Sequence, residues 1–142
     1  MTENELAKRA VTCRRWRWMP GMLTLEEIIP PAITLGWDEA RIINSDPGED
    51  ARVCTVLGRV RDIHATALPD LTDPATLGCI LHLVREAWNQ PHAAAAMGGF
   101  GWAVYSFVTN GIVGDEPAIN GRYGDGYTTE AEALVAALEA AP

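Results

Sequence analysis

Apolar side chains recur at helical spacing in three stretches of the chain. The first stretch covers residues 3–13 near the N-terminus. The second follows Asp73, a residue suited to the N-cap, with Pro74 at the first helical position. The third follows Thr129, which can form a capping box with Glu132. The pattern therefore predicts three helices. Their apolar stripes are Leu6, Ala7, Ala10 and Val11; Leu77, Ile80, Leu81, Val84, Ala87 and Trp88; and Ala133, Leu134, Ala137, Leu138 and Ala141.

Shorter apolar segments between these helices predict β-strands. They cover residues 16–25, 33–43, 52–62 and 102–108, which are rich in large apolar and β-branched side chains. In the first segment, Pro20 and Gly21 predict a turn or bulge that enters or interrupts the strand. Gly58 lies inside the third segment and indicates a bulge or a close approach within one strand.

The order of the predicted elements is helix, several strands, helix, strands and helix. Strands that occur in neighbouring groups favour an α+β fold, with an antiparallel or mixed sheet covered by helices in an α/β/α sandwich-like arrangement. A Rossmann fold is disfavoured because no Gly-x-Gly-x-x-Gly motif opens a helix after a strand. The length of 142 residues suits a single domain, residues 1–142, whose core needs no metal or disulfide.

The composition is that of a folded, soluble protein. Apolar residues make up 48% of the chain and charged residues 21%, which argues against disorder. No apolar run approaches the roughly 20 residues that a bilayer span needs, and the N-terminus lacks the features of a signal peptide. The net charge of -8 opposes binding to a long nucleic acid. We therefore expect a cytoplasmic protein with neither a membrane nor a polynucleotide as its partner.

Residues that could support catalysis or hold a metal are sparse. Cys13, Cys54 and Cys79 are widely spaced among apolar neighbours and resemble buried thiols. No Cys or His pair has the spacing of metal ligands. His64 with Asp62 is the one local pair that could exchange a proton with a substrate. The sequence therefore predicts no catalytic residue, no metal and no cofactor.

Basic residues gather near the N-terminus. Five of the eleven lie between Lys8 and Arg17. On a strand, Trp16 and Trp18 would share one face, and Arg15 and Arg17 would face the other way as a pair able to hold a phosphate. The alternative is that both indoles pack in the core or at a subunit interface while the arginines are solvated. The residues of this cluster are Arg14, Arg15, Trp16, Arg17 and Trp18.

Two further segments carry residues of the same kinds. Arg59 and Arg61 repeat the two-residue spacing and could join the first set from a second strand. Arg122, Tyr123 and Tyr127 lie in a glycine-rich loop before the last helix, where backbone N–H groups and aromatic rings could contact a ligand. An ordinary loop whose tyrosines cover the edge of the sheet is the alternative.

Three segments of the chain resemble a known family. They are LAKRA (residues 6–10) with WRWMPGM (16–22), LPDLTDPATLG (68–78) and TEAEAL (129–134). These segments resemble small uncharacterised proteins of bacteriophages and prophages, and through them the phage ABA-sandwich domain, a sheet between helix layers. The matching positions are mostly helix caps and packing positions, so no catalytic residue carries over. The resemblance implies a phage origin and expression in a bacterial host cytoplasm.

By analogy with phage inhibitors of host immunity, this resemblance leads to a functional hypothesis. We expect a homo-oligomer that sequesters a small anionic nucleotide-derived signal, such as a cyclic ADP-ribose relative or a cyclic dinucleotide, without catalysis. Three alternatives stay open: a protein that binds and blocks a host protein through the same surface, a structural phage protein, and a hydrolase of the signal. The predicted ligand-binding residues are Arg14, Arg15, Trp16, Arg17, Trp18, Arg59, Arg61, Arg122, Tyr123 and Tyr127.

Overall fold

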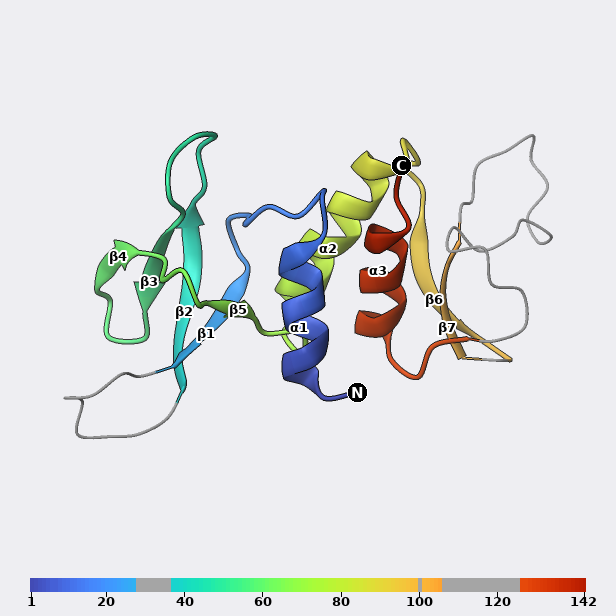
Figure 1. The fold of residues 1–142 in the computed structure, drawn as a ribbon, viewed down its shortest axis with the longest axis horizontal. Helices are drawn as coiled ribbons and strands as arrows, with labels where there is room; N and C mark the ends of the chain where they lie inside the picture. Colours follow the sequence, from blue (N-terminus) through green and yellow to red (C-terminus); the bar gives the residue numbers. More distant parts are fainter. Residues whose placement is uncertain (28–36, 100, 106–125) are drawn as a thin grey trace.

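The computed structural model describes residues 1–27, 37–99, 101–105 and 126–142 (Figure 1). Three helices and seven strands lie in this part of the chain. In chain order they are α1 (Glu3–Thr12), β1 (Leu23–Glu27), β2 (Trp37–Asn44), β3 (Arg52–Thr55), β4 (Val60–Asp62), β5 (Leu68–Pro69), α2 (Pro74–Ala87), β6 (Ala94–Gly98), β7 (Gly101–Tyr105) and α3 (Glu130–Glu139).

Five strands form an antiparallel sheet in the order β4-β3-β2-β1-β5. Its register pairs Leu23 with Arg41 and Arg41 with Cys54, so these three side chains form a row on one face of the sheet. Strands β6 and β7 form a separate antiparallel hairpin. A bridge between Trp102 and Tyr127 joins β7 to the chain just before α3.

The helices form one layer between the two sheets (Figure 1). On β2 and β3, Ala40, Ile42 and Val53 are buried in the same core as the helices. The alternate residues Glu39 and Arg41 are exposed, as the two-residue period of a strand requires. The five-stranded sheet therefore has an inner face against the helices and an outer face, which carries Glu39 and Arg41.

Helix α3 is the most deeply buried of the three helices. Seven of its ten residues are buried, and Ala133, Leu134 and Ala137 have no exposed area. It contacts α1, α2 and both strands of the hairpin. Trp88, at the end of α2, donates a hydrogen bond from Nε1 to the Ala137 carbonyl oxygen at 2.7 Å. Small side chains allow these neighbours to approach the α3 backbone closely.

The helix starts follow their sequence signals. Thr129 and Glu132 form the predicted capping box. Asp73 caps α2 and accepts a hydrogen bond from the Thr76 backbone N–H. Helix α1 occupies the predicted range to within one residue. The three predicted helices and the α+β fold, with an antiparallel sheet covered by helices, are therefore confirmed, but the helices form one layer between two sheets instead of the two outer layers of an α/β/α sandwich (Figure 1).

Two predictions about strands were wrong, and one strand was not predicted. Residues 16–19 form no strand, and the first strand begins only at Leu23, after the predicted turn at Pro20 and Gly21. The segment 52–62 is two strands instead of one, because Gly58, at φ 78°, lies in the turn between them. Strand β6 was not predicted, since its sequence, Ala-Ala-Ala-Met-Gly, lacks β-branched residues.

The other strand predictions agree with the described residues. Strand β2 lies at the end of the predicted segment 33–43, and β7 overlaps the start of 102–108. Residues 33–36 and 106–108 of these predictions lie outside the described residues. None of the described helices combines the length and the apolar character that crossing a membrane requires.

Polar contacts attach the start of α2 to the five-stranded sheet. The Thr76 hydroxyl accepts a hydrogen bond from the Leu23 N–H at 2.9 Å. The Asp73 carboxylate accepts hydrogen bonds from Arg41 at 3.1 and 3.3 Å and from Thr76. Partial burial alone would raise the pKa of Asp73, but the hydrogen bonds from Arg41 and Thr76 outweigh it and lower the pKa.

We predict that this carboxylate makes stability depend on pH. Asp73→Asn should keep the cap, because an amide oxygen can accept the Thr76 N–H, but should lose the charge that pairs with Arg41. Since the folded pKa is below the unfolded value of about 3.9, the charge stabilises the fold above about pH 4, and this contribution is lost as the pH falls further. The wild type should therefore lose more unfolding free energy than Asp73→Asn between about pH 7 and about pH 3.

Denaturant unfolding at both pH values would measure this difference. Asp73→Ala, which removes the cap as well, should cost about 1–2 kcal/mol at neutral pH. An identical pH dependence in the wild type and Asp73→Asn would contradict the role assigned to the Arg41–Asp73 pair.

Candidate functional site

The predicted cluster, residues 14–18, follows α1 directly and is here called the basic segment. The Cys13 carbonyl oxygen accepts a hydrogen bond from the Trp16 N–H at 3.0 Å, which closes a turn. Arg14 and Arg15 occupy the two central positions of this turn and are exposed. The turn therefore keeps these arginines out of the core. The sequence had predicted that a strand would separate them from it.

The two indoles of the basic segment anchor it. Trp16 and Trp18 contact each other edge to face, with ring centroids 5.3 Å apart and an angle of 84° between the planes. Both are half-buried and pack against the hydrophobic core. The Trp16 Nε1 atom is buried and has no hydrogen-bond partner among the described residues. These contacts agree with the packing alternative for the two indoles.

Arg15 and Arg17 do not form the predicted pair, because each contacts a different partner. Arg15 donates hydrogen bonds from Nε and a terminal nitrogen to the Pro142 carbonyl oxygen, at 3.2 and 2.8 Å. Arg17 forms an ion pair with Glu86 of α2 at 2.7 Å. The Arg17 hydrogen bond lowers the pKa of Glu86. Because both members of this ion pair are about half exposed, it contributes little to stability and its partner can be exchanged.

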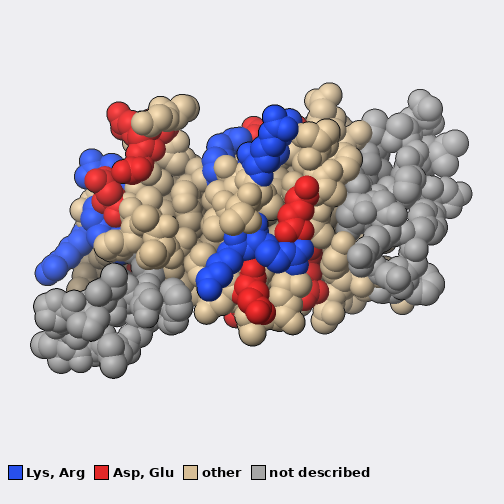
Figure 2. Space-filling view, in the orientation of Figure 1, with Lys and Arg blue, Asp and Glu red and all other residues tan. Residues whose placement is uncertain are grey.

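Further positive charge lies close to the basic segment. Lys8 and Arg9 belong to α1, and Arg9 binds the carboxylate of Glu139 at the end of α3. Arg14 has no hydrogen bond or ion pair with the residues that the structure describes. Figure 2 shows Lys and Arg side chains gathered over the middle of the molecule, with acidic groups beside them. Arg14 is therefore the cation of the segment most available to a ligand.

The other predicted site residues lie elsewhere. Arg59 is in the β3–β4 turn and Arg61 in β4, at the edge of the sheet far from the basic segment (Figure 1). The predicted convergence of these arginines with residues 14–18 is therefore wrong, because strands β3, β2 and β1 lie between them. Tyr127 is half-buried and exchanges backbone hydrogen bonds with Trp102. Arg122 and Tyr123 lie outside the described residues.

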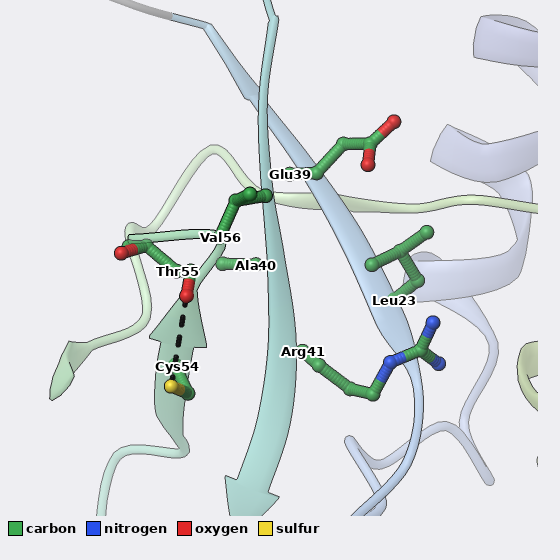
Figure 3. Close-up of a pocket in the computed structure, with 7 residues that line it drawn as sticks. All are labelled: Leu23, Glu39, Ala40, Arg41, Cys54, Thr55 and Val56. Carbon is green, nitrogen blue, oxygen red and sulfur yellow. Dashed lines mark hydrogen bonds between the residues drawn. The ribbon is translucent and has the colours of Figure 1, made fainter. Parts of the chain in front are cut away.

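The outer face of the five-stranded sheet has a hollow of about 270 Å³ that was not predicted from the sequence (Figure 3). Leu23, Glu39 and Arg41 line it from β1 and β2, and Cys54 and Val56 line it from β3 and the turn after it. The alternation of β2, with Ala40 and Ile42 inward, was a usable signal that Glu39 and Arg41 share the opposite face. The hollow itself depends on the pairing of three strands, which the sequence did not reveal.

The thiols and histidines of the described residues do not form a reactive group. Burial raises the pKa of the Cys13 thiol to about 11 and also raises the pKa of Cys79, so both stay protonated near neutral pH. His82 is exposed on α2 and contacts Glu86 at 3.1 Å. No three His, Cys, Asp or Glu side chains in the described ranges are placed to hold a metal ion.

The unused indole N–H of Trp16 leads to a prediction about stability. Trp16→Phe and Trp88→Phe remove the same part of a half-buried ring, but only Trp88 uses its Nε1 in a described hydrogen bond, to Ala137. Trp16→Phe should therefore cost less unfolding free energy than Trp88→Phe, by about 1–3 kcal/mol. Denaturant titration of both variants measures the difference. An equal or larger cost for Trp16→Phe would show that its N–H is hydrogen-bonded in solution.

Comparisons of the chain with protein family models, with curated proteins and with solved structures give no significant match. The resemblance to phage proteins therefore stays a prediction from the sequence.

Proposed function

We propose that the protein binds a small anionic ligand at the basic segment and holds it without chemical change. The observation that carries the proposal is the turn after α1, which exposes Arg14 and Arg15 beside Arg17 while Trp16 and Trp18 fix the backbone below them. Three guanidinium groups in four residues form a local cationic surface on a chain of net charge -8. Planar guanidinium groups match the oxygens of phosphates and carboxylates.

Ligand binding would replace existing contacts at low cost. Arg17 would exchange the exposed carboxylate of Glu86 for a ligand oxygen, and Arg15 would exchange the Pro142 carbonyl oxygen. Arg14 has no such described contact to give up. A charge-assisted hydrogen bond from Arg14 to an anion would therefore be a net gain, whereas Arg17 would exchange one anionic partner for another.

The ligand class follows from the cations and from the resemblance to phage proteins. A ligand with two or more phosphate groups could contact all three arginines. A nucleotide-derived immune signal is such a ligand, and its sequestration in a bacterial host cytoplasm would protect an infecting phage. Because both indoles are packed against the core, the arginines contribute most of the affinity, and base stacking has a smaller part than the sequence suggested.

A retention experiment tests the proposal. The purified protein is incubated with cyclic ADP-ribose isomers, ADP-ribose conjugates and cyclic oligonucleotides, then filtered and denatured, and the released compounds are identified by mass spectrometry. We expect intact recovery of at least one compound. Arg14→Ala and Arg15→Ala should each raise its Kd about tenfold or more, because each removes a charge-assisted contact. Arg52→Ala, which removes an exposed arginine of the distant sheet, is the matched control and should leave Kd unchanged.

Each other outcome has a defined meaning. Release of a cleaved compound would replace sequestration by hydrolysis. Recovery of every compound in the filtrate would reject the anion site, and the same arginine and tryptophan surface would then be tested against a protein partner.

A further inference from the structure

The turn between β3 and β4 exposes two large apolar side chains that do not pack in the hydrophobic core. The Thr55 N–H donates to the Arg59 carbonyl oxygen and the Gly58 N–H to the Thr55 carbonyl oxygen, both at 2.9 Å. Gly58, at φ 78°, completes a tight hairpin turn with a glycine bulge. Val56 and Leu57 occupy its two central positions and are 78% and 83% exposed. We call these two residues the hairpin tip.

Polar residues normally occupy such positions, because they lie in water and turns favour Asp, Asn and Ser. The backbone hydrogen bonds of this turn require neither a valine nor a leucine. Val60 and Ile43, on β4 and β2, are also large apolar residues that are about half exposed. Val60 pairs with Cys54, so its side chain lies on the outer face with that of Cys54. The tip therefore continues an exposed apolar surface on the outer face.

The hollow lies beside this tip on the same face. Val56 forms one wall and Leu23 the opposite one, with Glu39 and Arg41 between them (Figure 3). A cavity of about 150 Å³ already holds a benzene molecule. The hollow, at about 270 Å³, therefore has room for a leucine side chain.

The hollow and the hairpin tip each have one charged residue nearby, and the two charges are opposite. Glu39 stands at the hollow, and Arg59 follows the hairpin tip by two residues. Within the described part of the chain, neither side chain has a hydrogen-bond or ion-pair partner. A protein segment that placed a leucine in the hollow and a cation beside Glu39 would complement this site, and the hairpin tip itself has that composition.

We propose that the outer face binds a second copy of this chain. In a twofold dimer, each surface contacts the same surface of its partner, so a projecting group and its receptor must lie on one face. The hairpin tip and the hollow meet this condition. Leu57 of each chain would enter the hollow of the other, and Arg59 of each would approach the other Glu39. This contact goes beyond the anion site and does not depend on it.

Sedimentation equilibrium of the full chain tests the dimer. The wild type should have twice the mass of the 15.4 kDa chain at micromolar concentration. Leu57→Asp should raise the dimer Kd at least about tenfold, because it puts a charge into the apolar contact. Met97→Asp makes the same chemical change at an exposed position of the other sheet and should leave the Kd unchanged. Circular dichroism checks that each variant is folded.

A charge-reversal experiment then tests whether Glu39 of one chain contacts Arg59 of the other. Glu39→Arg and Arg59→Glu should each weaken the dimer, and the double variant should restore it because the pair forms again in reversed order. A wild type that stays monomeric at about 100 μM, well above the micromolar Kd of a modest interface, would overturn the proposal. A dimer that Leu57→Asp leaves intact, or that the double charge variant does not restore, would equally overturn it.

Discussion

The burial of α3 is the constraint on which the rest of the structure depends. This helix contacts α1 and α2 on its sides and the β6–β7 hairpin on its other face. It can do so because its buried residues are mostly alanines, with Leu134 and Leu138 filling the space between them. Removing α3 would separate the hairpin from the rest of the fold and expose one side of both other helices.

Both proposed binding surfaces lie outside this core, and both are fixed to it. The basic segment is held by its two indoles, which pack against the hydrophobic core. The outer face is fixed because the inner face of the same strands buries Ile42 and Val53 under the helices. Each surface therefore has a rigid support, which reduces the entropy lost when a ligand or a partner binds. The two surfaces are separate, so ligand binding and dimerisation can be tested independently.

Local signals account for what the sequence predicted well. Asp73 with Pro74, and Thr129 with Glu132, satisfy the first N–H groups of their own helices, so short segments fixed the helix starts. The path of residues 14–22 depends on contacts of Trp16 and Trp18 with a core that is distant in sequence, and the assumed strand was wrong for that reason.

The sequence also could not predict which residues of different strands lie near one another in the sheet. The alternation of Glu39 and Arg41 was visible in the sequence. Only the strand order shows that Arg59, in the β3–β4 turn, is separated from β1 by other strands and that Val56 borders a hollow. The sequence predicts that Val56 and Leu57 belong to a continuous strand, because apolar residues are uncommon at the centre of a turn. Their actual exposure is a property of the hairpin and not of the local composition.

Native-state hydrogen exchange of the backbone amides is the most direct test of the central role of α3. If the fold depends on this helix, the amides in the middle of α3 should exchange only through global unfolding, with the same free energy as that from denaturant unfolding. Amides near the basic segment and the hairpin tip should exchange faster, since they lie at the surface. Faster exchange in α3 than in β2 would contradict the account, because the sheet would then persist when α3 is unfolded.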